Sequence, residues 1–267
     1  MTQVVHKYHA NGNDFILTEN ADCITTLKAR KTLADRKLGI GCDQILFLQH
    51  NPSITRCTFY NQDGHSASLC LNGLYVVSQH LRNNYGEQNY SIEAEKDTYL
   101  TDLKEQSHAL HIPKATRKHF SEFKIPFDEW KTYPAYHIDV GNPHLIILVP
   151  ENELNAFPLK QLGKALQTCP PFIDGVNVSC LANDFTTPQT SMRIFERGVG
   201  LTESCGSAAL SATYLIEHHT NKDNICIQQP GGKIQLHKPD KSHPDSAWLF
   251  QSRCCYVAKI SLAPQPE

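Results

Sequence analysis

A segment that occurs twice is the feature that most constrains how this chain can fold. The first copy is TFYNQDGHSASLCLNGLYVVSQHL at residues 58–81, and the second is RIFERGVGLTESCGSAALSATYL at residues 193–215. Each copy predicts an apolar strand, a glycine-containing turn, a few small polar residues and a cysteine where a helix begins. Cys70 lies nine positions after Asn61, and Cys205 lies nine positions after Glu196.

The repetition extends upstream of both copies. Gly12-Asn13 matches Gly141-Asn142, and Gly41-Cys42-Asp43-Gln44 matches Asp174-Gly175-Val176-Asn177. The offsets are 129 (142 − 13), 133 (177 − 44) and, for the cysteines, 135 (205 − 70) residues. Ordered matches at a nearly constant offset predict two structurally similar halves. If the halves face each other, the two cysteines lie on opposite sides of one cleft.

Hydrophobic periodicity and turn residues place further elements in each half. Central helices are expected over 70–82 and 205–219, and shorter helices over 26–37 and 159–167. Strands are expected at 4–6, 15–17, 45–48, 58–60, 135–139, 145–149, 177–181, 191–195, 225–227, 234–237, 247–250 and 255–262, with a meander over 88–112. The polar, proline-containing stretch 113–134 is interpreted as the crossing between the halves, and Pro264 and Pro266 as part of a loose tail.

A cysteine at a helix start has a distinctive chemical environment. The first backbone N–H groups of the helix are unpaired there and the helix dipole is positive, which favours a thiolate and can bind a carboxylate. Gly198 and Gly200 would let the backbone approach a ligand closely. A buried, inert cysteine is the alternative for either position taken alone.

Composition argues against several classes of function. A net charge of −2 over 267 residues gives no basic surface for nucleic acid, and no apolar run approaches the length that spans a membrane. The N-terminus lacks a secretory signal, so the ten cysteines favour a reduced, cytoplasmic protein. CxxC and HExxH spacings are missing and Gly39-Ile40-Gly41 has no GxGxxG continuation, so neither a metal nor a nucleotide is expected.

Six motifs in order resemble those of diaminopimelate epimerase, a family of cofactor-independent amino-acid epimerases. They are HANGNDF (9–15), DRKLGIGCDQ (35–44), FYNQDG…LCLNG (59–73), VGNPH (140–144), DGVNV (174–178) and FERGVGLTESCGSA (195–208), and they span nearly the whole chain. The resemblance implies an α/β (α+β) protein of two pseudo-symmetric lobes. Each lobe is a curved, mostly antiparallel sheet wrapped around a central helix, with the active site in the cleft between them. We expect the N-terminal lobe at 1–112 with a returning strand at 255–267, and the C-terminal lobe at 113–254.

The implied reaction is epimerisation of LL-2,6-diaminopimelate to meso-2,6-diaminopimelate, in lysine and peptidoglycan precursor biosynthesis. Inverting a Cα most simply uses two groups on opposite faces, one removing a proton and one delivering a proton. Cys70 and Cys205 would be this thiolate/thiol pair, without pyridoxal phosphate, another cofactor or a metal. The partners expected are a small amino-acid substrate and a second copy in a homodimer, with neither nucleic acid nor membrane.

The resemblance also assigns binding roles. Arg197 would hold the distal carboxylate together with Asn61, Asn142 and Asn177, and Glu196 would hold amino groups. Asn13, Gln44 and His144 would line the site, and backbone N–H groups of Leu71, Asn72, Gly206 and Ser207 would bind the reacting carboxylate. Taken singly, the asparagines could be turn residues, His144 a core histidine and Glu196-Arg197 a surface ion pair.

Five positions depart from the family pattern. Leu71 stands in place of glycine beside Cys70, Tyr75 in place of arginine and Ala208 in place of glycine, and Ala10-Asn11 alters an HGLGN motif. Leu71 would be strained if the backbone there needed a positive φ. Two alternatives therefore stay open: a racemase of another amino acid with the same two-cysteine mechanism, and a catalytically silent binding protein of the same fold.

Overall fold

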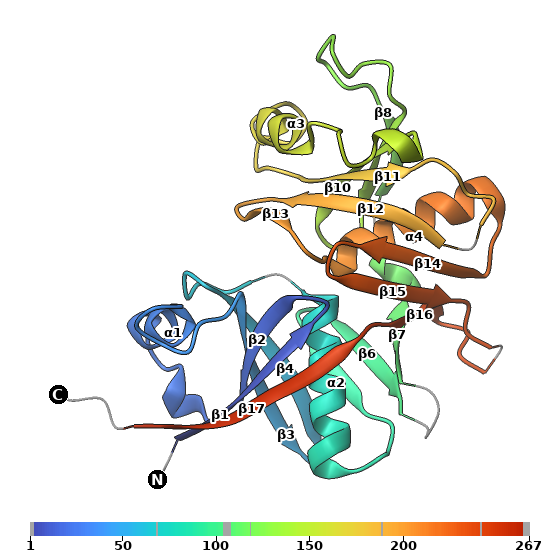
Figure 1. Ribbon diagram of the computed structural model, residues 1–267. Helices are drawn as coiled ribbons and strands as arrows, with labels where there is room; N and C mark the ends of the chain where they lie inside the picture. Colours follow the sequence, from blue (N-terminus) through green and yellow to red (C-terminus); the bar gives the residue numbers. More distant parts are fainter. Residues whose placement is uncertain are drawn as a thin grey trace. The chain divides into compact units, whose positions relative to one another are not determined.

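The chain forms two compact units in the computed structural model (Figure 1). The structure describes residues 3–67, 69–103, 108–117, 119–187, 189–240 and 242–263, so the expected proline-containing tail lies outside it. Unit 1 comprises residues 1–113 and 251–267, and unit 2 comprises residues 114–250. Each unit combines one sheet with a long helix and a short one, which makes the protein α+β as predicted.

Unit 1 is a sheet in the order β17-β1-β2-β3-β4-β5-β6-β7. Only the β2–β3 and β4–β5 pairs are parallel among these pairings. The strands are β1 (Gln3–Ala10), β2 (Asn13–Thr18), β3 (Gln44–Asn51), β4 (Ile54–Asn61), β5 (Ser91–Ala94), β6 (Asp97–Asp102), β7 (Ala109–Pro113) and β17 (Cys254–Leu262); the helices are α1 (Leu27–Ala34), α2 (Leu71–Tyr85) and a 3₁₀ turn, η1 (Ala21–Cys23).

The α2 helix is the centre of unit 1, where Figure 1 shows it enclosed by strands. Ten of its fifteen residues are buried, as the apolar run predicted. A Cβ added at Gly73 would come within 3.0 Å of the Leu46 side chain and 3.1 Å of Phe59. Glycine at this position therefore lets the first turn of α2, which follows Cys70, lie directly on the sheet.

Unit 2 repeats this arrangement in the order β8-β9-β10-β11-β12-β14-β15, with β10–β11 and β12–β14 parallel. Its strands are β8 (His119–Phe123), β9 (Ala135–Asp139), β10 (Pro143–Val149), β11 (Asn177–Ala182), β12 (Gln189–Glu196), β13 (Gly200–Thr202), β14 (Asn224–Gln229), β15 (Gly232–His237) and β16 (Ser246–Gln251). Its helices are α3 (Leu159–Leu166), α4 (Gly206–Thr220) and the 3₁₀ turns η2 (Lys114–Thr116) and η3 (Glu151–Glu153).

The two units share one topology with matching registers. Phe15 pairs with Gln44 in unit 1 and His144 with Asn177 in unit 2, which reproduces the offsets of 129 (144 − 15) and 133 (177 − 44). Both central helices have fifteen residues, and their first residues are 135 positions apart (206 − 71). The internal repeat seen in the sequence is thus a structural repeat.

Each unit has its own apolar core. In unit 2, α3 packs on β11 and β12 so closely that a Cβ at Gly163 would lie 2.5 Å from Cγ of Phe195. The α4 helix is buried from Gly206 to Ile216, so its apolar run forms the middle of the unit.

One sequence expectation needs correction at its edge. The helix expected over 26–37 ends at Ala34, because the Asp35 side chain accepts hydrogen bonds from the backbone N–H groups of Lys37 and Leu38 and turns the chain. The stretch 113–134, interpreted as the crossing between the halves, contains the regular strand β8 paired along β9.

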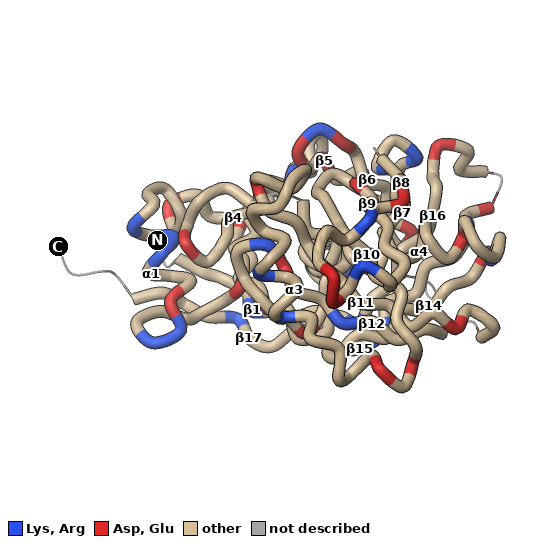
Figure 2. Tube along the Cα trace, turned by 90° about the horizontal axis from the view of Figure 1, so that it is seen from above, with Lys and Arg blue, Asp and Glu red and all other residues tan. Residues whose placement is uncertain are grey.

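The distribution of charged residues and the character of the helices agree with what the composition predicted. Figure 2 shows basic and acidic residues interspersed along the chain. Among the described residues, every helix is too short or too polar to cross a membrane.

Candidate active site

Cys205 is the residue from which α4 starts. Its backbone is extended (φ −137°, ψ 118°), its side chain is 7% exposed, and its Sγ lies 3.4 Å from Oγ of Ser207 in the first turn. The fully buried Gln229 at the end of β14 holds this residue from both sides. The Cys205 N–H donates to Oε1 of Gln229 (2.7 Å), and Nε2 of Gln229 donates to the Cys205 carbonyl oxygen (3.0 Å).

A series of hydrogen-bonding side chains leads from Cys205 into unit 2. Oγ of Ser207 lies 3.0 Å from Nε2 of His144 and 3.3 Å from Nδ2 of Asn142, and Nε2 of His144 lies 3.2 Å from Oδ1 of Asn142. His144 is fully buried, and this burial, with Arg197 and His137 adding repulsion, lowers the pKa of its imidazole to about 3. The imidazole is therefore neutral at physiological pH. It can orient the Ser207 hydroxyl beside the thiol, but it does not act as a cation.

Arg197 and its neighbours form a second group of expected site residues in unit 2. The Arg197 N–H donates to Oδ1 of Asn177 (2.9 Å), and its Nη1 donates to the carbonyl of Asp174 (3.1 Å). The aliphatic part of Arg197 lies across Gly175, where a Cβ would come within 2.7 Å of Cδ. The guanidinium is exposed, and within the described part of the chain it makes only that one hydrogen bond, so most of its donors can receive a carboxylate. Oε1 of Glu196 accepts from the Thr202 hydroxyl (2.6 Å).

Cys70 occupies the matching position in unit 1. Its backbone is extended (φ −121°, ψ 111°), and its half-buried Sγ accepts from the N–H of Gly73 (3.4 Å) and lies 3.7 Å from Oδ1 of Asn13. Leu71 is helical and 1% exposed, so the departure from glycine fills the core and needs no positive φ. The strain considered from the sequence is not present.

An ion network that the sequence analysis did not single out fixes the Asn13 amide. Nδ2 of Asn13 donates to Oδ2 of Asp43 (3.0 Å), which also accepts from the N–H of Asp14 (3.0 Å). Nη2 of Arg36 lies 2.7 Å from Oδ1 of Asp14 and 2.7 Å from Oδ1 of Asp43, so Arg36 bridges the two carboxylates. Because a carboxylate only accepts, the amide is oriented with its Oδ1 toward Cys70. The DRKLGIGCDQ motif carried this signal, since it contains both Arg36 and Asp43.

Gln44 and Asn61 lie side by side on β3 and β4. They are paired in register, and Nε2 of Gln44 donates to Oδ1 of Asn61 (3.2 Å). The positions that match them in the other unit are Asn177 and Glu196, by the offsets of 133 and 135. Oε1 of Gln44 is buried and has no hydrogen-bond partner among the described residues, so it is an acceptor available to a ligand.

The expected site residues therefore gather in two sets, one in each unit, around the start of the central helix. Unit 1 brings together Asn13, Gln44, Asn61, Cys70, Leu71 and Asn72, and unit 2 brings together Asn142, His144, Asn177, Glu196, Arg197, Cys205, Gly206 and Ser207. Tyr75, in place of the family arginine, is absorbed into packing: it stacks on His108 (4.1 Å between ring centroids) and donates to the His108 carbonyl (3.0 Å). Gln229, Asp43 and Arg36 are the supporting residues that sequence reasoning missed.

Comparison with known proteins agrees with this arrangement. The sequence model of the diaminopimelate epimerase family matches residues 5–117 and 136–247. The chain belongs to the diaminopimelate epimerase family. The diaminopimelate epimerase of Rickettsia prowazekii (strain Madrid E) is 31% identical over 220 residues, which cover 77% of this chain and 78% of that one. The enzyme of the same name from Sphingopyxis alaskensis is 29% identical over 247 residues, or 86% and 87% of the two chains.

Solved structures show the same fold at lower sequence identity. A Bacillus anthracis phenazine biosynthesis protein of the PhzF family is similar with a TM-score of 0.73, at 12% identity, over 99% of this chain and 100% of that one. Membership in the diaminopimelate epimerase family makes this protein an isomerase of the epimerase type, as its sequence predicted.

Proposed function

We propose that this protein interconverts LL- and meso-2,6-diaminopimelate with Cys70 and Cys205 as its two acid/base residues. The observation that carries the proposal is that each cysteine precedes the central helix of its unit at the same place in a repeated topology. A chain that needed only structural cysteines has no reason to repeat this position. Family membership supplies the substrate.

The reaction balances with the two cysteines alone. One thiolate removes the substrate Cα proton and becomes a thiol, while the other thiol delivers its proton to the opposite face and becomes a thiolate. The reverse reaction exchanges their roles. The mechanism requires one cysteine to reach each face of the substrate Cα.

The charge that develops during proton removal needs hydrogen-bond donors. The N–H groups of the first turns, at Leu71 and Asn72 in α2 and at Gly206 and Ser207 in α4, lie where helix N–H groups have no helical partner. They are suited to the carboxylate on the reacting carbon, and the helix dipoles add to this attraction. We therefore propose no cofactor and no metal for this step.

We assign the distal carboxylate of the substrate to Arg197 and to nearby asparagine side chains. The exposed guanidinium of Arg197 can bind a carboxylate in a bidentate manner, and the Asn177 side chain holds the Arg197 backbone in place. Asn61 and Asn142 would complete this subsite, and Glu196 would bind an amino group. Replacing Arg197 by methionine should reduce kcat/KM for diaminopimelate by about 30-fold or more, because a distal carboxylate is left unpaired.

The wider setting follows the family. We propose that the protein is cytoplasmic, serves lysine and peptidoglycan precursor synthesis, and works as a homodimer. Sedimentation of the protein at several concentrations tests the dimer.

The decisive experiment measures exchange of the substrate Cα proton in heavy water. Wild type should incorporate deuterium into diaminopimelate and epimerise it, whereas Cys70→Ala and Cys205→Ala should each lose epimerisation while keeping wild-type unfolding curves. Cys226→Ala is the matched control, because Cys226 is half-buried on β14 and outside both sets. Near-wild-type turnover in either site variant would refute the two-thiol mechanism.

Three departures from the family pattern, Leu71, Tyr75 and Ala208, favour one second candidate, a racemase of another amino acid. A panel of amino acids assayed for deuterium incorporation distinguishes the diaminopimelate epimerase from a racemase of another amino acid. Faster exchange in an amino acid that lacks a second carboxylate would replace diaminopimelate as the substrate. No exchange in any of them would indicate the silent binding protein.

A further inference from the structure

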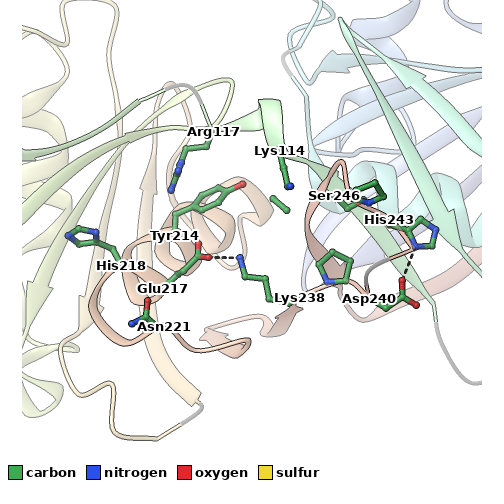
Figure 3. Close-up of a pocket in the computed structure, with 13 residues that line it drawn as sticks. Lys114, Arg117, Tyr214, Glu217, His218, Asn221, Lys238, Asp240, His243 and Ser246 are labelled. Carbon is green, nitrogen blue, oxygen red and sulfur yellow. Dashed lines mark hydrogen bonds and ion pairs between the residues drawn. The ribbon is translucent and has the colours of Figure 1, made fainter.

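Unit 2 contains a hollow that the proposed reaction does not use. Its volume is about 610 Å³, within the range of small-molecule sites. It lies along the second half of α4, whereas Cys205 precedes the first turn of that helix (Figure 3). The lining residues that bear charge or a buried hydroxyl group include Lys114 in η2, Arg117 just after it, Tyr214 and Glu217 on α4, and Lys238 and Asp240 after β15.

The acidic side chains of the hollow already have partners. Glu217 forms an ion pair with Lys238, whose Nζ also lies 4.0 Å from the centroid of the Trp248 ring. Oδ1 of Asp240 accepts from the N–H of Ser242 (2.9 Å) and lies 3.4 Å from Nδ1 of His243. The charge of Glu217 is therefore compensated by Lys238, and the Asp240 carboxylate is engaged in hydrogen bonds with neighbouring groups.

Two cations of the hollow are not compensated in this way. The guanidinium of Arg117 lies over the ring of Tyr214, 5.1 Å from its centroid, and within the described residues it makes neither an ion pair nor a hydrogen bond. The ammonium group of Lys114 likewise has no acidic or hydrogen-bonding partner in the described part of the chain. Both side chains are exposed and flank the same space, as Figure 3 shows.

Tyr214 adds a hydrogen-bond donor between them. The residue is 3% exposed, and its buried hydroxyl has no partner among the described residues, which is unusual for a buried polar group. Burial raises the pKa of this hydroxyl to about 12, so it keeps its proton. In Figure 3 the hydroxyl points toward Lys114, along the wall of the hollow.

We propose that this hollow is a binding site for a small organic anion carrying a carboxylate or a phosphate group. Arg117 and Lys114 attract the charge from two sides, and the Tyr214 hydroxyl donates to one of its oxygen atoms. The volume admits a molecule larger than an inorganic ion, and the proline and alanine side chains contact its uncharged part. The site is distinct from the one around Cys205, since it shares none of the residues assigned there.

The test is calorimetric titration of the whole protein with citrate and with glucose 6-phosphate, at constant ionic strength, with glucose as the neutral counterpart. Citrate represents the carboxylate class and glucose 6-phosphate the phosphate class, so the arms show which group is preferred. Saturable binding of at least one anion, without binding of glucose, is expected. Arg117→Gln and Lys114→Gln should each weaken it about tenfold, the usual size for one charged contact.

Three further variants place the site. Tyr214→Phe should weaken binding several-fold without lowering the unfolding temperature, because the hydroxyl has no partner to lose. Lys160→Gln, which removes an exposed cation on α3, and Arg197→Met should both bind as wild type does. Absence of saturable binding by either anion overturns the proposal, as does binding that survives Arg117→Gln unchanged or that disappears in Arg197→Met.

Discussion

Gln229 offers a sharp test of how the start of α4 is held in place. Its side-chain amide makes two hydrogen bonds to the backbone of Cys205, at 2.7 and 3.0 Å, and the residue is completely buried. Methionine has nearly the same length and cannot replace either bond. In Gln229→Met the Cys205 N–H loses its Gln229 acceptor in a region that water does not reach, whereas the Cys205 carbonyl loses one of two donors and still accepts from the N–H of Ala209 (3.1 Å).

The magnitude follows from these two bonds. A buried backbone donor that loses its acceptor costs about 1–3 kcal/mol, and the carbonyl, which keeps the bond from Ala209, adds about 0.5–1.5 kcal/mol for the hydrogen bond that it loses. Relaxation of the helix start recovers part of this, and we expect a loss of about 2 kcal/mol in the free energy of unfolding. For a protein of this size that corresponds to roughly 4–8 °C in Tm. Turnover should fall as well, because the Cys205 thiol moves with its backbone.

Urea unfolding and kcat/KM measured on the same preparations provide the assay. Gln235→Met is the matched control, since Gln235 is exposed on the neighbouring strand β15. A Gln229→Met protein within about 0.5 kcal/mol of wild type would show that these bonds do not stabilise the helix start.

Three other expectations concern single contacts. Asp43→Asn should lower kcat/KM about ten- to hundredfold with little change in stability, because the Asn13 amide can then rotate and exchange its oxygen and nitrogen positions. Steady-state kinetics checks this, and an unchanged kcat/KM would contradict it. His144, with its pKa lowered by burial from the ordinary 6.5 to about 3, stabilises the fold fully above pH 6.5, and this contribution is lost as the pH falls from 6.5 toward 3. Urea midpoints should therefore fall more steeply below pH 6.5 in wild type than in His144→Gln, and parallel curves would argue against a neutral buried imidazole. Gly163→Ala should cost about 1–3 kcal/mol by pressing on Phe195, as thermal unfolding can show against the exposed Lys164→Ala, and equal Tm values would mean that α3 shifts without cost.

Much of the fold could be predicted because the chain states it twice. The cysteine, the small residues before it and the apolar run after it are local signals, and they placed the starts of α2 and α4 to within one residue. The offsets of 129 and 133 then reappeared as strand registers, since a register is fixed by which side chains must face the core, and the offset of 135 reappeared between the central helices.

The supporting residues could not be found in the same way. Gln229 follows Cys205 by 24 residues (229 − 205) and reaches it only because β14 packs beside α4. Gln229 is the second of two adjacent glutamines before Pro230-Gly231 and carries no periodic pattern, and the position 135 earlier, in unit 1, is Ala94. Asp43 was within a recognised motif, but its partner Asn13 is 30 residues away, so its role in orienting an amide is visible only in three dimensions.

The place of β17 in the chain has a consequence for synthesis. This strand pairs with β1 and completes the sheet of unit 1, yet it follows the whole of unit 2 in the sequence. After residue 113 has left the ribosome, another 140 residues (253 − 113) must emerge before β17 does. At about 5–20 residues per second this leaves β1 with an open edge for roughly 7–28 seconds. Unit 2 is continuous and can close during that interval, so the half that is made first is the half that is finished last.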